Sequence, residues 1–258
     1  MSKILSKDGV INHKKQAIKK MNDTFEKLIN SADDRKLKKA DLIAYWIEAY
    51  SKYLDREASF DYSKVMRYSR GDIIQVNFGF NIGSEQGGLH YAVVIDNDNL
   101  KSSPVITVIP LSSGSEKDAH QRDLYLGNEL YEKVNTKYEK LRVKTTKELL
   151  VVQQMFKIID VLRERNSKEL SDPEVIGQIK KWNNESKRLE EESKRLSIFE
   201  KEVNKLKQGS IALMEQITTI SKMRIYQPKN SDDLLYNISF SNAAMDKINK
   251  RLTELFIH

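Results

Sequence analysis

The sequence changes its periodicity at Arg70-Gly71-Asp72-Ile73-Ile74-Gln75-Val76-Asn77-Phe78 (residues 70–78), where a helical pattern gives way to short β-branched and aromatic runs. Such runs, separated by Gly, Pro, Asn and Ser clusters, are typical of a small antiparallel barrel or sandwich. A second group of runs follows Gly209, and it is too small to form a sheet alone. We therefore predict one sheet built from both groups. The other runs are residues 91–95, 105–109, 123–126, 210–214, 217–220 and 223–226.

Helical patterns surround these strands. Residues 1–66 carry apolar residues at helical spacing in two groups, and Ser31-Ala32-Asp33-Asp34 between them supplies turn and capping chemistry. Residues 242–258 predict a last helix. Its apolar face consists of Met245, Ile248, Leu252 and Leu255.

Residues 128–208 predict a long antiparallel helical hairpin that interrupts the strands. Its two arms are separated at Ser171-Asp172-Pro173, where Asp172 suits an N-cap and Pro173 the first helical position. The second arm has a thin apolar stripe, which needs the fuller stripe of the first arm to cover it. The first stripe is Tyr138, Leu141, Thr145, Leu149, Val152, Phe156 and Ile159, and the second is Trp182, Leu189, Leu196 and Val203.

The predicted fold class is therefore α+β, with a small antiparallel barrel at its centre. We expect an N-terminal helical extension over residues 1–66 and the first part of the barrel over 67–127. The coiled-coil hairpin should occupy 128–208, and the second part of the barrel with the last helix 209–258.

Composition limits the classes of function. The chain of 258 residues has no cysteine, which excludes disulfides and thiolate chemistry, and 31% of its residues are charged. No run is long and apolar enough for a membrane span or a secretory signal, so we expect a cytoplasmic protein with no membrane partner. The net charge of +7 lies mainly in the helical segments, where a solvated mixed-charge face explains it. This charge permits RNA binding without arguing for it.

Five segments together resemble the toxins of the PemK/MazF family. The family opens with a pattern like residues 70–74 and 81–88, continues with a strand and turn like 90–98, and then with a strand like 103–112. Residues 214–224, Met-Glu-Gln-Ile-Thr-Thr-Ile-Ser-Lys-Met-Arg, resemble a later block of the family. The segments occur in the family's order, whereas the N-terminal helices and the hairpin lie outside the resemblance.

The resemblance implies an SH3-like barrel that acts as a homodimer and is controlled by a cognate antitoxin protein. It also implies an endoribonuclease that cleaves single-stranded RNA without metal or any other cofactor. In that reaction the ribose 2′-OH attacks the adjacent phosphate and leaves a 2′,3′-cyclic phosphate and a 5′-OH. Such a site needs groups that move protons and donors that stabilise the charge on phosphorus.

Three residues are implied as catalytic. The family has an arginine after its Gly-Gly-x turn and a threonine at the end of its third strand; here these positions hold His90 and Ser112. Histidine loses the bidentate phosphate contact of arginine, yet it transfers protons near neutral pH. A structural, hydrogen-bonded histidine is the alternative. Glu85 either assists His90 or caps a turn.

The implied RNA-binding residues lie in two places, the loop before His90 and the block after Gly209. Gly87 and Gly88 also serve backbone needs, and buried structural hydrogen bonding is an equal alternative for the acidic and amide residues of the later block. The set is Ser84, Gln86, Gly87, Gly88, Glu215 and Gln216.

Two other functions remain open at this stage. Related toxins of this fold inhibit DNA gyrase without cutting nucleic acid, and the missing arginine favours such a binder. Alternatively, the hairpin dominates and the chain is an assembly protein with an inactive barrel.

Overall fold

The computed structural model describes residues 6–164 and 172–257, and it divides into two compact units. One unit contains two N-terminal helices and the loop of residues 77–89; the other contains the remaining elements. Each unit is described by itself below.

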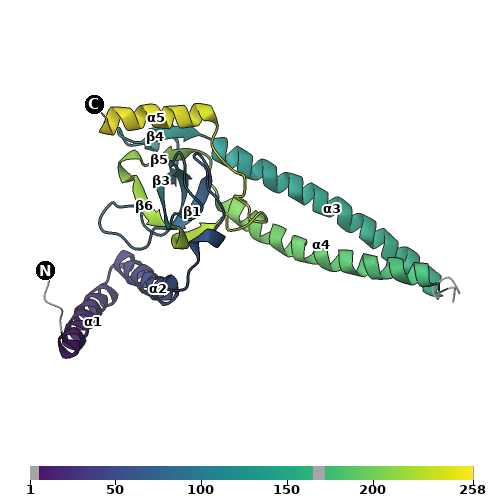
Figure 1. Ribbon diagram of the computed structural model, residues 1–258, viewed down its shortest axis with the longest axis horizontal. Helices are drawn as coiled ribbons and strands as arrows, with labels where there is room; N and C mark the ends of the chain where they lie inside the picture. Colours follow the sequence, from purple (N-terminus) through teal and green to yellow (C-terminus); the bar gives the residue numbers. More distant parts are fainter. Residues whose placement is uncertain (1–5, 165–171, 258) are drawn as a thin grey trace. The chain divides into compact units, whose positions relative to one another are not determined.

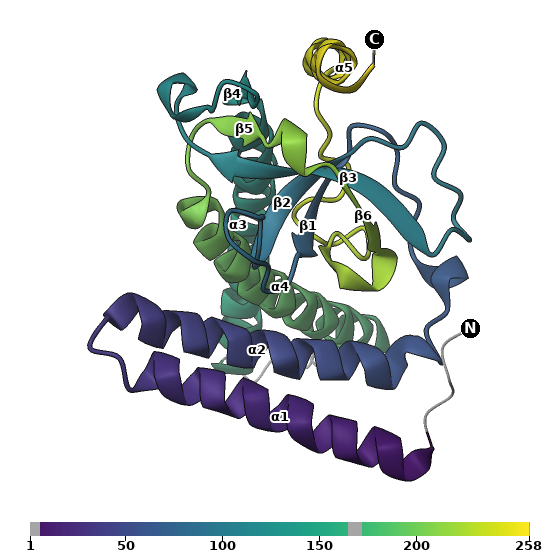
Figure 2. The same ribbon diagram turned by 90° about the vertical axis from the view of Figure 1, so that its left-hand side faces the viewer.

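The first unit is built on two adjacent helices, α1 (Lys7–Ile29) and α2 (Asp34–Glu57), which lie side by side (Figure 2). Asp33 caps α2, as predicted, because its carboxylate accepts a hydrogen bond from the Arg35 amide at 3.0 Å. The loop of residues 77–89 packs on α2. The Trp46 ring lies so close to Gly79 that a Cβ atom there would come within 2.7 Å of it. The Tyr53 hydroxyl also accepts a hydrogen bond from the Asn77 amide at 3.3 Å.

The second unit contains the antiparallel sheet, whose strands come from both sides of the hairpin as predicted. The strand order is β4-β5-β3-β2-β1-β7, with β6 also paired to β3 (Figures 1 and 2). The central strand is β3, which the sequence predicted to be shorter. The strands are β1 (Ile73–Asn77), β2 (Leu89–Val94), β3 (Val105–Ser113), β4 (Leu124–Gly127), β5 (Ser210–Ala212), β6 (Thr218–Ser221) and β7 (Ile225–Gln227).

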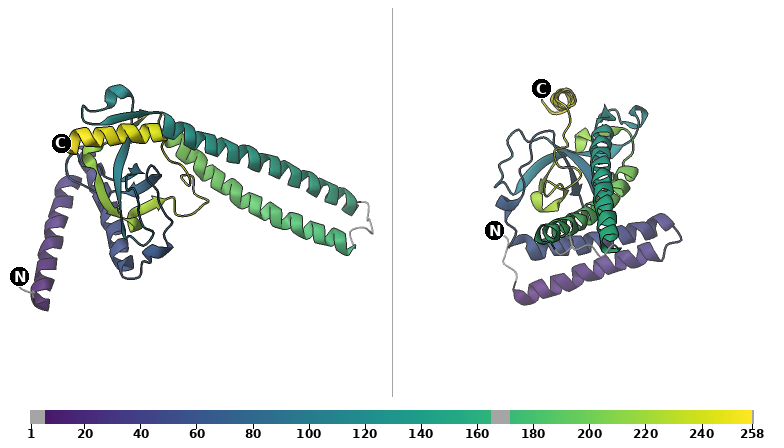
Figure 3. Two further views of the ribbon diagram at one scale, coloured as in Figure 1. Left: turned by 45° about the horizontal axis from the view of Figure 1, so that its top comes forward. Right: turned by 90° about the vertical axis from the view of Figure 1, so that its right-hand side faces the viewer.

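Two long helices, α3 (Glu129–Glu164) and α4 (Pro173–Lys205), run side by side away from the sheet (Figures 1 and 3). Asp172 caps α4 through the Glu174 amide, as predicted, whereas Ser171 lies outside the described residues. The predicted seam is confirmed. In α3 it buries Tyr138, Thr145, Val152 and Ile159, and in α4 it buries Leu189 and Val203.

The base of the hairpin belongs to the core of the sheet. Leu130, Val134 and Phe199 pack in one apolar cluster with Ile109 and Leu111 of β3. The predicted C-terminal helix, α5 (Asn242–Phe256), adds Met245 and Ile248 to the same cluster. The hairpin and α5 therefore cover one face of the sheet.

A polar cluster also joins α4 to the sheet. The side-chain amide of Gln227 donates to Gln75 at 2.9 Å and to the Glu202 carboxylate at 3.2 Å. Burial raises the pKa of Glu202, and burial together with Glu202 raises the pKa of Tyr91 to about 12. The carboxyl group of Glu202 is thus held where its charged form is disfavoured.

A buried lysine holds the loop between β2 and β3. Lys222 is 2% exposed, and its ammonium group donates to the carbonyl oxygens of Leu100 at 2.8 Å and Lys101 at 3.4 Å. Asp96 organises the same loop, because its carboxylate accepts from the Asn99 amide and from the Thr107 backbone. The loop is therefore fixed by charged groups that point inward.

Candidate active site

The pairing of β2 with β3 relates His90 to Ser112. The observed partners are Ala92 with Pro110, Val93 with Ile109 and Val94 with Val108, so the two residue numbers of each pair add up to the same value. The observed pairing ends at Ala92 and Pro110; the same register carried two residues further would set His90 opposite Ser112. A strand pair of this kind brings facing side chains within contact range.

The alternation of side chains also places both residues on one face of the sheet. Tyr91 and Leu111, which the same register sets opposite each other, both pack in the cluster beneath the hairpin and α5. Neighbouring residues on a strand point to opposite faces. His90 and Ser112 therefore lie on the face away from the hairpin.

Neither side chain is committed to a structural role. His90 and Ser112 are half-buried, and within residues 6–164 and 172–257 their side chains make no hydrogen bond. Burial lowers the pKa of the His90 imidazole below its ordinary value of 6.5. The neutral ring, which can accept a proton, is therefore the prevailing form at neutral pH.

The block after Gly209 wraps around the bend of β3 next to this pair. The Leu213 amide donates to the carbonyl oxygen of Pro110 at 2.9 Å, and Thr218 then pairs with Val108. Between them the short 3₁₀ helix η4 (Met214–Gln216) presents Glu215 and Gln216. Both implied residues therefore lie beside the strand segment that ends at Ser112.

Glu215 is not buried, since its carboxylate is 47% exposed and forms an ion pair with Arg122 at 2.6 Å. Arg122 was not among the residues selected from the sequence. No local signal marks it, because β4 and η4 become neighbours only after the long hairpin has returned the chain to the sheet. It places a guanidinium group beside Glu215.

The loop of residues 77–89 is held by its own backbone within the first unit. The Gly88 amide donates to Gly79 at 2.6 Å, and a Cβ atom on Gly87 would come within 2.9 Å of the same oxygen. Gly88 also has a φ of 78°, so the predicted backbone requirements of both glycines are confirmed. The turn carries Ser84 and Gln86.

Glu85 has the turn-capping contact that was one of its two predicted roles. Its carboxylate accepts a long hydrogen bond of 3.4 Å from the Ile82 amide. Residues 84–88 belong to the first unit. The candidate site in the second unit therefore consists of His90, Ser112, Glu215 and Gln216.

The described residues form no cluster of three or more His, Cys, Asp or Glu side chains suited to a metal ion. No helix among residues 6–164 and 172–257 combines the length and apolarity needed to cross a bilayer.

The fold and the site define a small antiparallel barrel of the α+β class, with a proton-transfer group and a hydroxyl on the face of the sheet away from the hairpin. Residues 69–170 match the family model of the PemK-like, MazF-like toxin of type II toxin-antitoxin systems, and this segment belongs to that family. No match is found among curated proteins. The matched segment includes His90 and Ser112, whereas β5, β6 and β7 complete the sheet from beyond it. Type II toxins have a cognate antitoxin, which is thereby implied as a partner.

Proposed function

We propose that the chain is a toxin that cleaves single-stranded RNA without a metal ion, with His90 as the acid and base of the reaction. The observation that supports this proposal is the register of β2 and β3, which, carried two residues beyond its last observed pair, would set the neutral imidazole of His90 opposite the Ser112 hydroxyl on the face of the sheet away from the hairpin. Both groups lie in the segment matched by the toxin family.

The proposed reaction is an internal transesterification. The neutral imidazole of His90 takes the proton of a ribose 2′-OH, and the 2′ oxygen forms a bond to the adjacent phosphorus. The bond between phosphorus and the 5′ oxygen breaks, and the imidazolium returns its proton to that oxygen. The products are a 2′,3′-cyclic phosphate and a 5′-OH. Ser112 donates a hydrogen bond to a non-bridging oxygen as negative charge develops there.

The remaining implied residues have supporting roles in this proposal. Gln216 contacts a base or the RNA backbone beside the bend of β3, and Arg122 with Glu215 provides charge at the same corner. Contact of residues 84–88 with RNA, and a catalytic role for Glu85, rest on the family resemblance alone. A homodimer, which rests on the family, and a cytoplasmic location, which rests on the composition, complete the proposal.

The deciding assay is incubation of the purified protein with single-stranded RNA in excess chelator, followed by mapping of the product ends. We expect cyclic phosphate and 5′-OH ends. His90→Ala should lower the rate by about 10² to 10⁴, the usual contribution of a positioned acid or base, and Ser112→Ala should lower it less. His13→Ala on α1 is the matched histidine control and should cleave at the unmodified rate.

Two results would contradict the proposal. Cleavage that stops with chelator, or 3′-OH ends, would exclude the mechanism. A folded His90→Ala protein of full activity would remove His90 from it and leave Glu85 as the next candidate. A protein that leaves RNA intact but binds a target such as DNA gyrase would establish the non-catalytic alternative.

A further inference from the structure

The outer side of α3 carries a second regular stripe of residues, which no part of the proposed RNA chemistry uses. Its members alternate at spacings of four and three, the pattern of a coiled-coil seam. We call this stripe the outer seam; it consists of Thr136, Lys140, Val143, Lys147, Leu150, Gln154, Lys157 and Val161, with Val151 and Ile158 beside it.

The apolar members of the outer seam are open to solvent. Val143, Leu150, Val151, Ile158 and Val161 are between 44% and 54% exposed. The seam that packs against α4 contains Thr145, Val152 and Ile159, which lie on the opposite side of the same helix. A helix that is apolar on two opposite faces is ordinarily covered on both.

The charge of the outer seam is positive. Lys140, Lys147 and Lys157 form no ion pair with any residue of the described ranges, whereas Glu139 at its edge is paired with Arg142 at 2.7 Å. A second copy of α3 in register would bring its lysines close to those of the first copy, and this repulsion between like charges disfavours self-association. The complementary surface therefore has apolar residues alternating with Asp or Glu.

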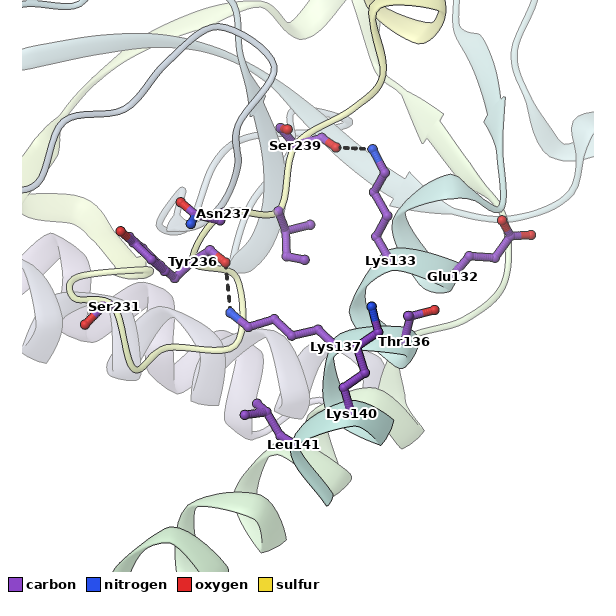
Figure 4. A pocket seen from close by; sticks show the side chains of 11 residues that line it. Glu132, Lys133, Thr136, Lys137, Lys140, Leu141, Ser231, Tyr236, Asn237 and Ser239 are labelled. Carbon is purple, nitrogen blue, oxygen red and sulfur yellow. Dashed lines mark hydrogen bonds between the residues drawn. The ribbon is translucent and has the colours of Figure 1, made fainter. Parts of the chain in front are cut away.

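The outer seam ends at a pocket of about 650 Å³, between α3 residues 132–141 and loop residues 231–239 (Figure 4). Two lysines of the pocket are used by the fold, since Lys133 donates to the Ser239 carbonyl at 2.6 Å and Lys137 to that of Tyr236 at 2.8 Å. Lys140 at the same pocket makes no such bond. The pocket thus gives the seam a defined, positively charged end.

We propose that the outer seam is a docking surface for an acidic amphipathic helix of a partner protein. Apolar residues of the partner helix cover Val143, Leu150 and Val161, and carboxylates of the partner helix pair with the three unpaired lysines of the outer seam. The seam from Thr136 to Val161 is about 37 Å long at the α-helical rise, enough for a partner helix of five or more turns. This binding is separate from RNA cleavage, because the residues of the outer seam are not those of the proposed catalytic pair.

The probe is a fluorescent synthetic helix of four heptads, with leucine at its core positions and glutamate opposite the lysines; a second peptide has lysine in place of glutamate. Anisotropy with the full-length protein should show that the acidic peptide binds and the basic one does not. Changing Lys140, Lys147 and Lys157 to Glu should weaken binding of the acidic peptide at least about tenfold and create binding of the basic peptide.

The matched control changes Lys14, Lys15 and Lys19 of α1 to Glu, which alters the net charge equally and should leave the affinity unchanged. Equal binding of both peptides, or no effect of the three substitutions in α3, would overturn the proposal. So would light scattering that shows a dimer dissolved by those substitutions, since a second copy would then occupy the seam. Tighter binding of a single-stranded oligonucleotide through the same lysines would assign the surface to nucleic acid instead.

Discussion

Replacing Thr145 by Val should stabilise the hairpin. Thr145 is 1% exposed in the seam between α3 and α4, and its hydroxyl has no hydrogen-bond partner among the residues that the structure describes. Threonine hydroxyls in helices commonly bond to the carbonyl four residues earlier, as Thr24 does to Lys20 at 2.9 Å and Thr253 does to Asn249 at 3.0 Å. A buried hydroxyl without a partner costs about 1–3 kcal/mol.

The size of the effect follows from what each substitution removes. Valine keeps the shape of threonine and has a similar helix propensity, so Thr145→Val should raise the free energy of unfolding by about 1–2 kcal/mol. Thr145→Ala also removes a buried methyl group worth about 1 kcal/mol, so its net effect should be small. Thr145→Ser keeps the unpaired hydroxyl and loses the methyl group, and should be destabilising by about 1 kcal/mol.

The measurement is urea unfolding followed by the fluorescence of Trp182 on α4, in a Trp46→Phe background that removes the other tryptophan. Thr253→Val is the control; this exposed side chain should change stability by no more than about 0.5 kcal/mol. An unchanged or lower midpoint for Thr145→Val at constant slope would refute the reasoning. The hydroxyl would then have a partner in solution.

Three further outcomes are expected. Deleting residues 150–186 and closing the shortened hairpin with a flexible linker should leave the circular dichroism of the sheet and RNA cleavage intact, because the core residues at the base of the hairpin remain. Loss of folding would show that the distal parts of the two helices are needed. Lys222→Met should lower the free energy of unfolding by about 1–3 kcal/mol, because the Leu100 carbonyl loses a buried donor, and an unchanged melting curve would contradict this. Burial raises the pKa of Glu202 in the folded state, so the free-energy cost of its buried charge is absent at low pH and grows as the pH rises above the ordinary carboxyl pKa. Glu202→Gln should therefore be more stable than the unmodified protein at neutral pH, and the difference should vanish near pH 4. Urea titration at several pH values measures this difference.

The sequence predicted those parts of the fold that depend on local patterns. The strands of the sheet, the caps at Asp33 and Asp172 and the seam of the hairpin all follow from spacing and capping chemistry. That the strands on both sides of the insertion share one sheet also followed, because the later strands are too few to form a sheet alone.

The parts that were not predicted depend on contacts between distant segments. The packing of residues 77–89 on α2 is set by Trp46 against Gly79, and no pattern in either segment indicates it. The ion pair between Arg122 and Glu215 likewise needs the whole hairpin to return the chain. At the site, the sequence indicated His90 and Ser112 by resemblance, whereas their relation across the sheet needed the register of β2 and β3.

The position of β3 has a consequence for synthesis of the chain. Ser112 pairs with Ile211, and Ile106 pairs with Ile220. The central strand therefore pairs with residues that are synthesised about one hundred residues after it. The hairpin between them makes mostly local contacts and can form first. The formed hairpin brings Gly127 beside Ser210, so the chain segment that must be closed for β4 and β5 to pair is short. The strand that carries Ser112 thus acquires its last neighbours only after the whole hairpin has been synthesised. A message broken within the hairpin would therefore yield a chain without a completed sheet.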